Sequence, residues 1–140
     1  MFQKVSCIIT GGSFKPSLLA CQHRPCLKEP VDPGEIGMRG RYKNRPWPYG
    51  ACFIEPTDDW NILYESRLLW MVNFLIRHKK DFENQGAESF SIHCTYYYDK
   101  QCSLEITDEE IQGLAKLGMD IAIDCVESPV EWERGQTDNA

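Results

Sequence analysis

The sequence predicts an α+β fold. We expect a single domain over residues 1–127, with a mixed or mainly antiparallel sheet of five to six strands and about three helices on one face, followed by a polar tail over residues 128–140. Short runs in which apolar and polar residues alternate are typical of half-buried strands, and they are interleaved with runs of helical spacing. The length of 140 residues, of which 42% are hydrophobic and 26% charged, suits one domain with its own core.

The first half of the chain predicts three strands and one short helix. Gly11-Gly12-Ser13 ends the first strand, and Ser13 suits the N-cap of the helix. Three prolines between His23 and Gly34 predict a connection without regular structure. The strands are expected at residues 2–10, 35–41 and 49–55, and the helix at residues 14–22.

The longest helix is expected from about Asn61 to Asn84, with Asp58 or Asp59 as its N-cap and Gly86 beyond its end. Its apolar residues recur at helical spacing and form one broad stripe. The stripe consists of Leu68, Leu69, Met71, Val72, Leu75 and Ile76.

Trp70 and Phe74 stand one turn apart on this helix, beside its polar face and off the stripe. Large aromatic side chains at a helix surface are typical of protein contacts. The two residues are therefore a candidate surface for self-association into a homodimer.

The region after Gly86 predicts a hairpin. Residues 90–98 and residues 102–106 both alternate between apolar and polar side chains. A three-residue loop between them pairs Tyr98 with Cys102 and keeps both apolar sets on one face.

A capping box at Thr107 to Glu110 then predicts a helix that Gly118 closes. Residues 120–126 return as a strand, with its aliphatic residues on one face. The residues that the helix is expected to bury are Ile111, Leu114, Ala115 and Leu117.

The cysteine content indicates a cytoplasmic protein with reduced thiols. The chain has seven cysteines, an odd number, and several alternate with aliphatic residues in strand-like runs. Its N-terminus lacks the basic start and long apolar run of a signal peptide. No apolar stretch approaches the roughly 18 residues that span a bilayer, so no membrane contact is expected.

Cys21, His23 and Cys26 place three soft ligands within six residues. A structural zinc site usually adds a second pair of ligands at short spacing, and the sequence has none that matches. The turn at Gly11-Gly12 also lacks the lysine or third glycine of a phosphate-binding loop. The sequence therefore predicts no cofactor, with a metal site at these three residues as the alternative.

The charge distribution points to a protein partner. A formal net charge of −6 disfavours nucleic acid as the main partner, despite the cationic and aromatic segment 39–47. Between Glu105 and Glu133 lie nine acidic residues and a single base, Lys116. Such a surface either keeps the protein soluble or binds a basic partner. The residues expected to contact that partner are Asp108, Glu109, Asp124, Glu127 and Glu131.

Several features in order resemble an uncharacterised bacterial family, the domain of unknown function 4279: the proline-rich connection ending in Pro33-Gly34-Glu35, the long amphipathic helix before a hydrophobic strand, and the pattern from Ile111 to Asp124. Together they cover most of residues 5–127. Some small bacterial proteins of this kind look like immunity proteins that neutralise toxins. The resemblance implies no catalytic residues.

The sequence thus favours a non-catalytic protein-binding module over an enzyme. With the resemblance, the expectation is a bacterial immunity protein that inhibits a basic, nuclease-type toxin through an acidic surface. The alternative is a small-molecule- or metal-dependent enzyme that uses Cys21, His23, Cys26 or His93.

Overall fold

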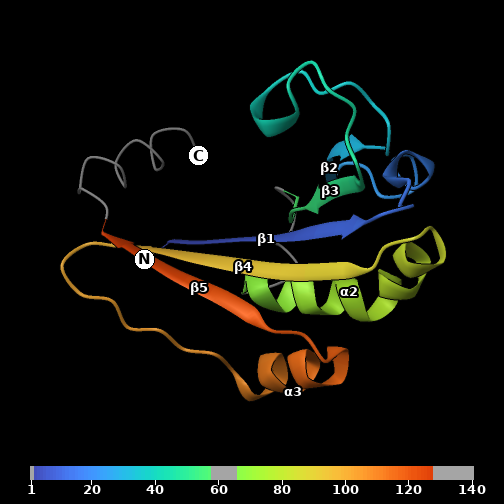
Figure 1. Cartoon of the computed structure of the whole chain (residues 1–140). Helices are drawn as coiled ribbons and strands as arrows, with labels where there is room; N and C mark the ends of the chain where they lie inside the picture. The colour runs from blue at the N-terminus through green and yellow to red at the C-terminus, as the bar shows by residue number, and fades with distance from the viewer. Residues whose placement is uncertain (1, 58–65, 128–140) are drawn as a thin grey trace.

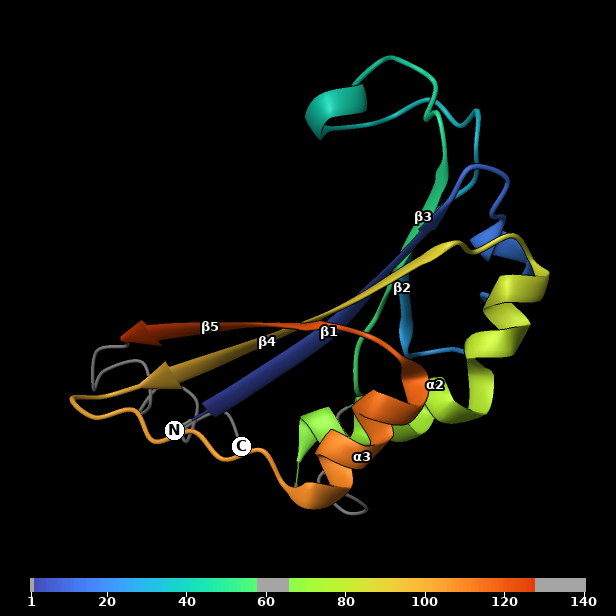
Figure 2. The same cartoon turned by 60° about the horizontal axis from the view of Figure 1, so that its bottom comes forward.

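Five strands form one sheet in the residues that the structure, a computed structural model, describes, namely 2–57 and 66–127 (Figure 1). Two α-helices lie on one face of this sheet, as Figure 2 shows from a second side. The predicted α+β class is therefore confirmed. The elements are β1 (Phe2–Gly11), η1 (Pro16–Leu18), β2 (Leu27–Val31), η2 (Gly40–Tyr42), β3 (Gly50–Ile54), α2 (Arg67–Asn84), β4 (Ser89–Tyr98), α3 (Asp108–Leu117) and β5 (Ile121–Glu127).

The sheet has the order β2-β3-β1-β4-β5, so the first strand of the chain lies at its centre. β1 pairs antiparallel with both β3 and β4, and β2 pairs antiparallel with β3. β4 and β5 are parallel, and a parallel pair needs a crossover connection, which α3 provides. The sheet is therefore mixed, and β2 and β5 are its edges.

The predicted hairpin after β4 is wrong. Residues 99–107 contain no strand, and β4 pairs with β1 on one side and with β5 on the other. Because both of its edges are occupied, β4 has none left for a strand at residues 102–106. The thiol of Cys102 lies beside that of Cys125 on β5, and desolvation and a hydrogen bond with Cys125 raise its pKa.

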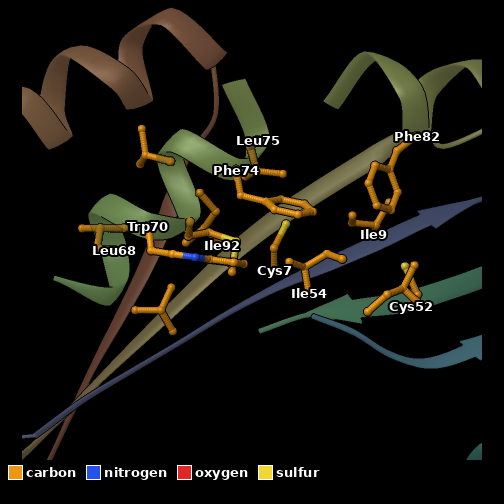
Figure 3. Close-up of a cluster of buried hydrophobic side chains, with 14 of the residues drawn as sticks. Cys7, Ile9, Cys52, Ile54, Leu68, Trp70, Phe74, Leu75, Phe82 and Ile92 are labelled. Carbon is orange, nitrogen blue, oxygen red and sulfur yellow. The ribbon is translucent and has the colours of Figure 1, made fainter. Parts of the chain in front are cut away.

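Alternate side chains of the central strands form the core beneath the helices. Cys7 of β1 lies opposite Ile54 of β3 and Ile92 of β4, and all three are fully buried. Figure 3 shows Phe74 and Leu75 reaching this layer from α2. Burial raises the pKa of the Cys7 thiol to about 12. The thiol is therefore protonated and packs as a small apolar group, as the strand pattern predicts.

The connection between β1 and β3 is more regular than predicted in one place and less in another. Of the helix expected at residues 14–22, only Pro16–Leu18 is helical, as a 3₁₀ turn. β2 lies within residues 23–34, which were expected to have no regular structure. It is an edge strand with an irregular register around Pro30, and an edge tolerates a residue without an N–H.

α2 begins at Arg67 with Ser66 as its N-cap, later than the predicted start near Asn61. The predicted caps Asp58 and Asp59 lie outside the described residues. The predicted end of the helix is confirmed. Neither of the two described α-helices is long and apolar enough to cross a membrane.

The structure contradicts the position assigned to Trp70 and Phe74. Trp70 is 8% and Phe74 is 4% exposed, and their rings stack with centroids 5.2 Å apart. α2 packs against both the sheet and α3, so it buries a wider arc than the predicted stripe. At the other edge of that stripe, Ile76 is 40% exposed. The two aromatic residues thus belong to the core, and self-association through them loses its basis.

The capping box at the start of α3 is confirmed. The Thr107 hydroxyl accepts a hydrogen bond from the backbone N–H of Glu110, and the Glu110 carboxylate accepts one from the backbone N–H of Thr107, both at 3.2 Å. Gly118 ends the helix in the left-handed conformation, with φ of 65°.

The buried face of α3 differs from the prediction. Ile111 is 54% exposed and Ala115 is also exposed, whereas Leu114 is buried. The reason is a close approach to α2 at Gly113, where a Cβ would lie 2.2 Å from Cγ1 of Val72. The glycine lets the helices approach and turns Ile111 and Ala115 away from the contact.

Candidate functional site

A pocket of about 570 Å³ lies on the sheet face away from the helices. Ile8, Ala51 and Phe53 contribute to its lining from β1 and β3, where they alternate with core residues and so point to the opposite face. Residues 32–49, here called the cap segment, contribute most of the remaining lining and project away from the helices (Figure 2). The volume is typical of ligand pockets, which measure about 300–1,000 Å³. The full lining is Ile8, Thr10, Glu29, Pro30, Val31, Glu35, Ile36, Gly37, Met38, Arg39, Trp47, Tyr49, Ala51, Cys52 and Phe53.

The cap segment has a defined conformation although it contains no strand. Its two arms are joined by backbone hydrogen bonds from the N–H of Gly34 to the carbonyl of Trp47 at 2.8 Å, and from the N–H of Gly37 to the carbonyl of Arg45 at 2.9 Å. The strand predicted over residues 35–41 is therefore wrong, and isolated bridges take its place. The backbone bonds hold one wall of the pocket in place.

Three aromatic rings stiffen the cap segment next to the pocket. The ring of Trp47 lies 4.8 Å from that of Tyr42 and 5.6 Å from that of Tyr49, measured between centroids. The guanidinium of Arg41 covers the ring of Tyr42 at 5.7 Å. Burial, followed by the effect of neighbouring Tyr42, raises the pKa of Tyr49. The pocket wall is thus packed before any ligand arrives.

The pocket, called the sheet pocket from here on, has an apolar rim with one ion pair. Met38 is 87% and Ile36 is 60% exposed. Arg39 and Glu29 form an exposed ion pair at 2.7 Å. Cys52 borders the pocket only from the strand, because its fully buried side chain belongs to the core on the other face of the sheet, where burial raises the pKa of its thiol to about 12. The lining suits the binding of an apolar group.

The residues predicted as metal ligands do not come together. Cys21 is exposed and Cys26 is half-buried. Among the described residues, His23 instead lies with His78 and Asp81, and their possible ligand atoms are all within 4.8 Å of one another. The sequence thus identified His23 as a candidate ligand, but the side chains beside it in the fold are those of His78 and Asp81 and not the predicted cysteines.

His78 and Asp81 were missed by sequence reasoning, although their spacing of three places them on one face of a helix. That spacing is common among solvated helix residues, so it became informative only once the fold brought His23 beside them. His93, the remaining candidate of the enzyme alternative, lies on β4 opposite Ser6 of β1 and faces away from the core.

Four of the five acidic residues predicted to bind a partner are exposed, but they are not gathered in one place. Asp108 and Glu109 lie in the first turn of α3, where their charges favour the helix dipole. Asp124 and Glu127 lie on β5, where their spacing of three points them to opposite faces of the sheet. In Figures 1 and 2 the far end of β5 points away from α3. Glu131 and the predicted tail lie outside the described residues.

The sheet pocket, the histidine cluster and the acidic residues lie on different parts of the fold. The pocket is at the β2 edge of the sheet, and the acidic residues are on α3 and at the β5 edge. Comparison of the chain with protein-family models, with curated proteins and with solved structures found no match.

Proposed function

We propose that the chain is a non-catalytic protein-binding module that receives an apolar side chain of its partner in the sheet pocket. The observation that supports this most is the pocket itself, an apolar hollow of about 570 Å³ with a preformed aromatic wall. A site that is already shaped costs less ordering on binding, so more of the contact energy remains as affinity.

The rim of the pocket favours a protein over a small molecule. Methionine, arginine and aromatic residues are enriched at protein interfaces. The lining of the sheet pocket contains all three kinds, namely Met38, Arg39, Trp47 and Tyr49. Exposed Met38 and Ile36 extend the apolar area outside the hollow. A partner that covers the rim buries this area, whereas a ligand confined to the hollow leaves it in water.

The finer proposal is a cytoplasmic immunity protein whose partner is a basic, nuclease-type toxin. It is supported by the net charge of −6, by seven free cysteines and by the exposure of Asp108, Glu109, Asp124 and Glu127. Charges of this kind mainly raise the rate of encounter, whereas a filled pocket slows dissociation. Changes to the acidic surface should therefore alter the association rate, whereas changes to the sheet pocket should alter the dissociation rate.

Filling the sheet pocket is expected to weaken partner binding by at least roughly tenfold, the cost of losing about 1.4 kcal/mol. Ala51→Phe places a ring in the pocket, because Ala51 lines it. Ala122→Phe is the matched control: Ala122 is exposed and pairs with His93, so it shares the open face but lies at the opposite edge strand. Both variants and the wild type are used to capture partners from the native host, and dissociation of the captured protein is then measured.

The proposal gains support if one stoichiometric partner dissociates faster from Ala51→Phe while Ala122→Phe behaves as the wild type. Circular dichroism and the unfolding midpoint confirm that both variants are folded. Docking at the pocket is contradicted if the partner binds the wild type and Ala51→Phe equally well. It is also contradicted if the partner dissociates more slowly from Ala51→Phe than from Ala122→Phe.

Charge reversal on β5 tests the acidic surface separately. Asp124→Lys with Glu127→Lys is expected to lower the association rate with a basic partner by roughly tenfold and to flatten its salt dependence. Glu83→Lys with Glu88→Lys has the same change in charge at exposed sites outside this surface. Equal rates for the two double variants would exclude a steering role for the β5 carboxylates.

A further inference from the structure

His23 is held in the core at the junction of η1 and β2. Its backbone N–H donates to the carbonyl of Leu19 at 3.1 Å, and its carbonyl accepts from the N–H of Leu27 at 3.0 Å. The residue is 6% exposed, with its ring stacked on Phe82 at 5.1 Å and edge-on to Phe74 at 5.4 Å. The imidazole thus has a fixed position in apolar surroundings.

His78 and Asp81 on α2 meet this imidazole. The rings of His23 and His78 lie 4.8 Å apart between centroids. Nδ1 of His78 lies 3.6 Å from Oδ2 of Asp81, which is too long for a hydrogen bond. Nε2 of His23 and Nδ1 of His78 are both buried, and neither has a hydrogen-bond partner among the residues that the structure describes. Buried polar atoms without partners are uncommon, so the pair calls for a ligand between them.

We propose that His23, His78 and Asp81 form a binding site for a divalent transition-metal ion, with zinc as the ion that the site fits best. Two imidazoles and one carboxylate are the ligand set of zinc sites that keep a fourth position open. Tetrahedral zinc with ligands at about 2.0–2.2 Å holds its ligand atoms about 3.3 Å apart. The possible ligand atoms of the three side chains already lie within 4.8 Å of one another, so a bound ion has to draw them together by only a short distance.

The surroundings of His23 suit a metal ligand. Phe74 and Phe82 flank His23, and within the described residues its Nε2 has no hydrogen-bond partner. Burial, followed by the nearby His78, lowers the pKa of His23, which favours the neutral imidazole that binds metals. The side chain of Asp81 is 47% exposed, so an ion can enter from solvent.

Metal binding here would also join two parts of the fold. His23 lies in the turn between η1 and β2, whereas His78 and Asp81 lie on α2. An ion that binds all three favours the folded chain over the unfolded one, because the site exists only when turn and helix are packed together. The open fourth position remains available to water or to a ligand from outside the chain.

The test is a titration of the metal-stripped full chain with Zn²⁺, followed by calorimetry and metal analysis after dialysis. We expect one equivalent to bind with a micromolar or tighter dissociation constant. His78→Gln and Asp81→Asn, both at partly exposed side chains, should each weaken this binding by more than roughly tenfold, since even the loss of an outer-shell partner costs that much. His93→Gln is the matched control, because it removes a histidine on the opposite face of the sheet.

Thiols compete for zinc, so a second control removes the two that lie nearest to His23 in the sequence. In Cys21→Ser with Cys26→Ser the proposed site is intact, and binding should be unchanged. Co²⁺ used as a spectroscopic probe should give the visible bands of a low-symmetry site without thiolate charge-transfer bands. The proposal is overturned if His78→Gln and Asp81→Asn bind Zn²⁺ as the wild type does, if the thiol variant loses the site, or if the wild type binds no Zn²⁺.

Discussion

Replacing Phe74 by alanine is expected to lower the free energy of unfolding by about 3–5 kcal/mol, the usual cost of deleting a buried aromatic ring. Phe74 is 4% exposed and contacts four rings, those of Trp70 at 5.2 Å, His23 at 5.4 Å, His78 at 4.8 Å and Phe82 at 6.3 Å. No neighbouring side chain can fill the space without leaving its own contacts, so a cavity remains.

Urea unfolding followed by circular dichroism measures this loss, and sedimentation measures the oligomeric state in parallel. Ile111→Ala is the control, because Ile111 is a large apolar residue that is 54% exposed, and its truncation should cost less than about 1 kcal/mol. We expect Phe74→Ala to lose stability with no change in mass. A variant that kept its stability but dissociated from a dimer would restore the self-association surface that the sequence predicted.

The position of Phe74 shows what the sequence alone could not provide. The apolar stripe predicted for α2 suits a helix that packs on one neighbour, whereas α2 packs on the sheet and on α3. Which second neighbour a helix has depends on the crossover from β4 to β5, a long-range property that local spacing does not contain. The error at Ile111 has the same origin, because the face of α3 is set by the close approach of Gly113 to Val72.

Local signals were more reliable. The capping box at Thr107 and Glu110 follows from four adjacent residues and is present in full. The alternation that predicted β4 also holds. The predicted burial of strand cysteines is confirmed for Cys7, Cys52 and Cys94, whereas Cys125 on the edge strand β5 is exposed. The hairpin at residues 102–106 failed although its alternation was equally clear, because pairing depends on which strand edges remain free.

The candidate sites also show the difference between local sequence signals and long-range packing. His23 was recognisable as a possible ligand from its type, but its neighbours His78 and Asp81 come from a helix more than fifty residues away in the sequence. The sheet pocket had no sequence signal beyond the aromatic and cationic character of residues 39–47. Its lining joins residues of three strands to the cap segment, and the register of those strands brings them together.

Replacing Glu110 by alanine is expected to lower the free energy of unfolding by about 2–3 kcal/mol, because it removes hydrogen bonds to a buried carboxylate. Glu110 is 2% exposed, although it lies in the first turn of a surface helix. Its carboxylate accepts from the hydroxyl of Thr107 at 2.8 Å and from the hydroxyl of Ser66 at 3.4 Å. Ser66 is the N-cap of α2 and Thr107 that of α3, so one side chain joins the starts of both helices.

Two variants separate this role from the general effect of a negative charge near a helix N-terminus. Glu109→Ala removes the adjacent exposed carboxylate and should cost only about 0.3–1 kcal/mol, the value of the dipole interaction. Glu110→Gln keeps an oxygen that can accept from Thr107 and should fall between the two. If urea unfolding gave equal losses for Glu109→Ala and Glu110→Ala, the carboxylate of Glu110 would act through charge alone. The junction it forms would then contribute nothing to holding α3 on α2, and the close contact at Gly113 would have to fix the crossover helix by itself.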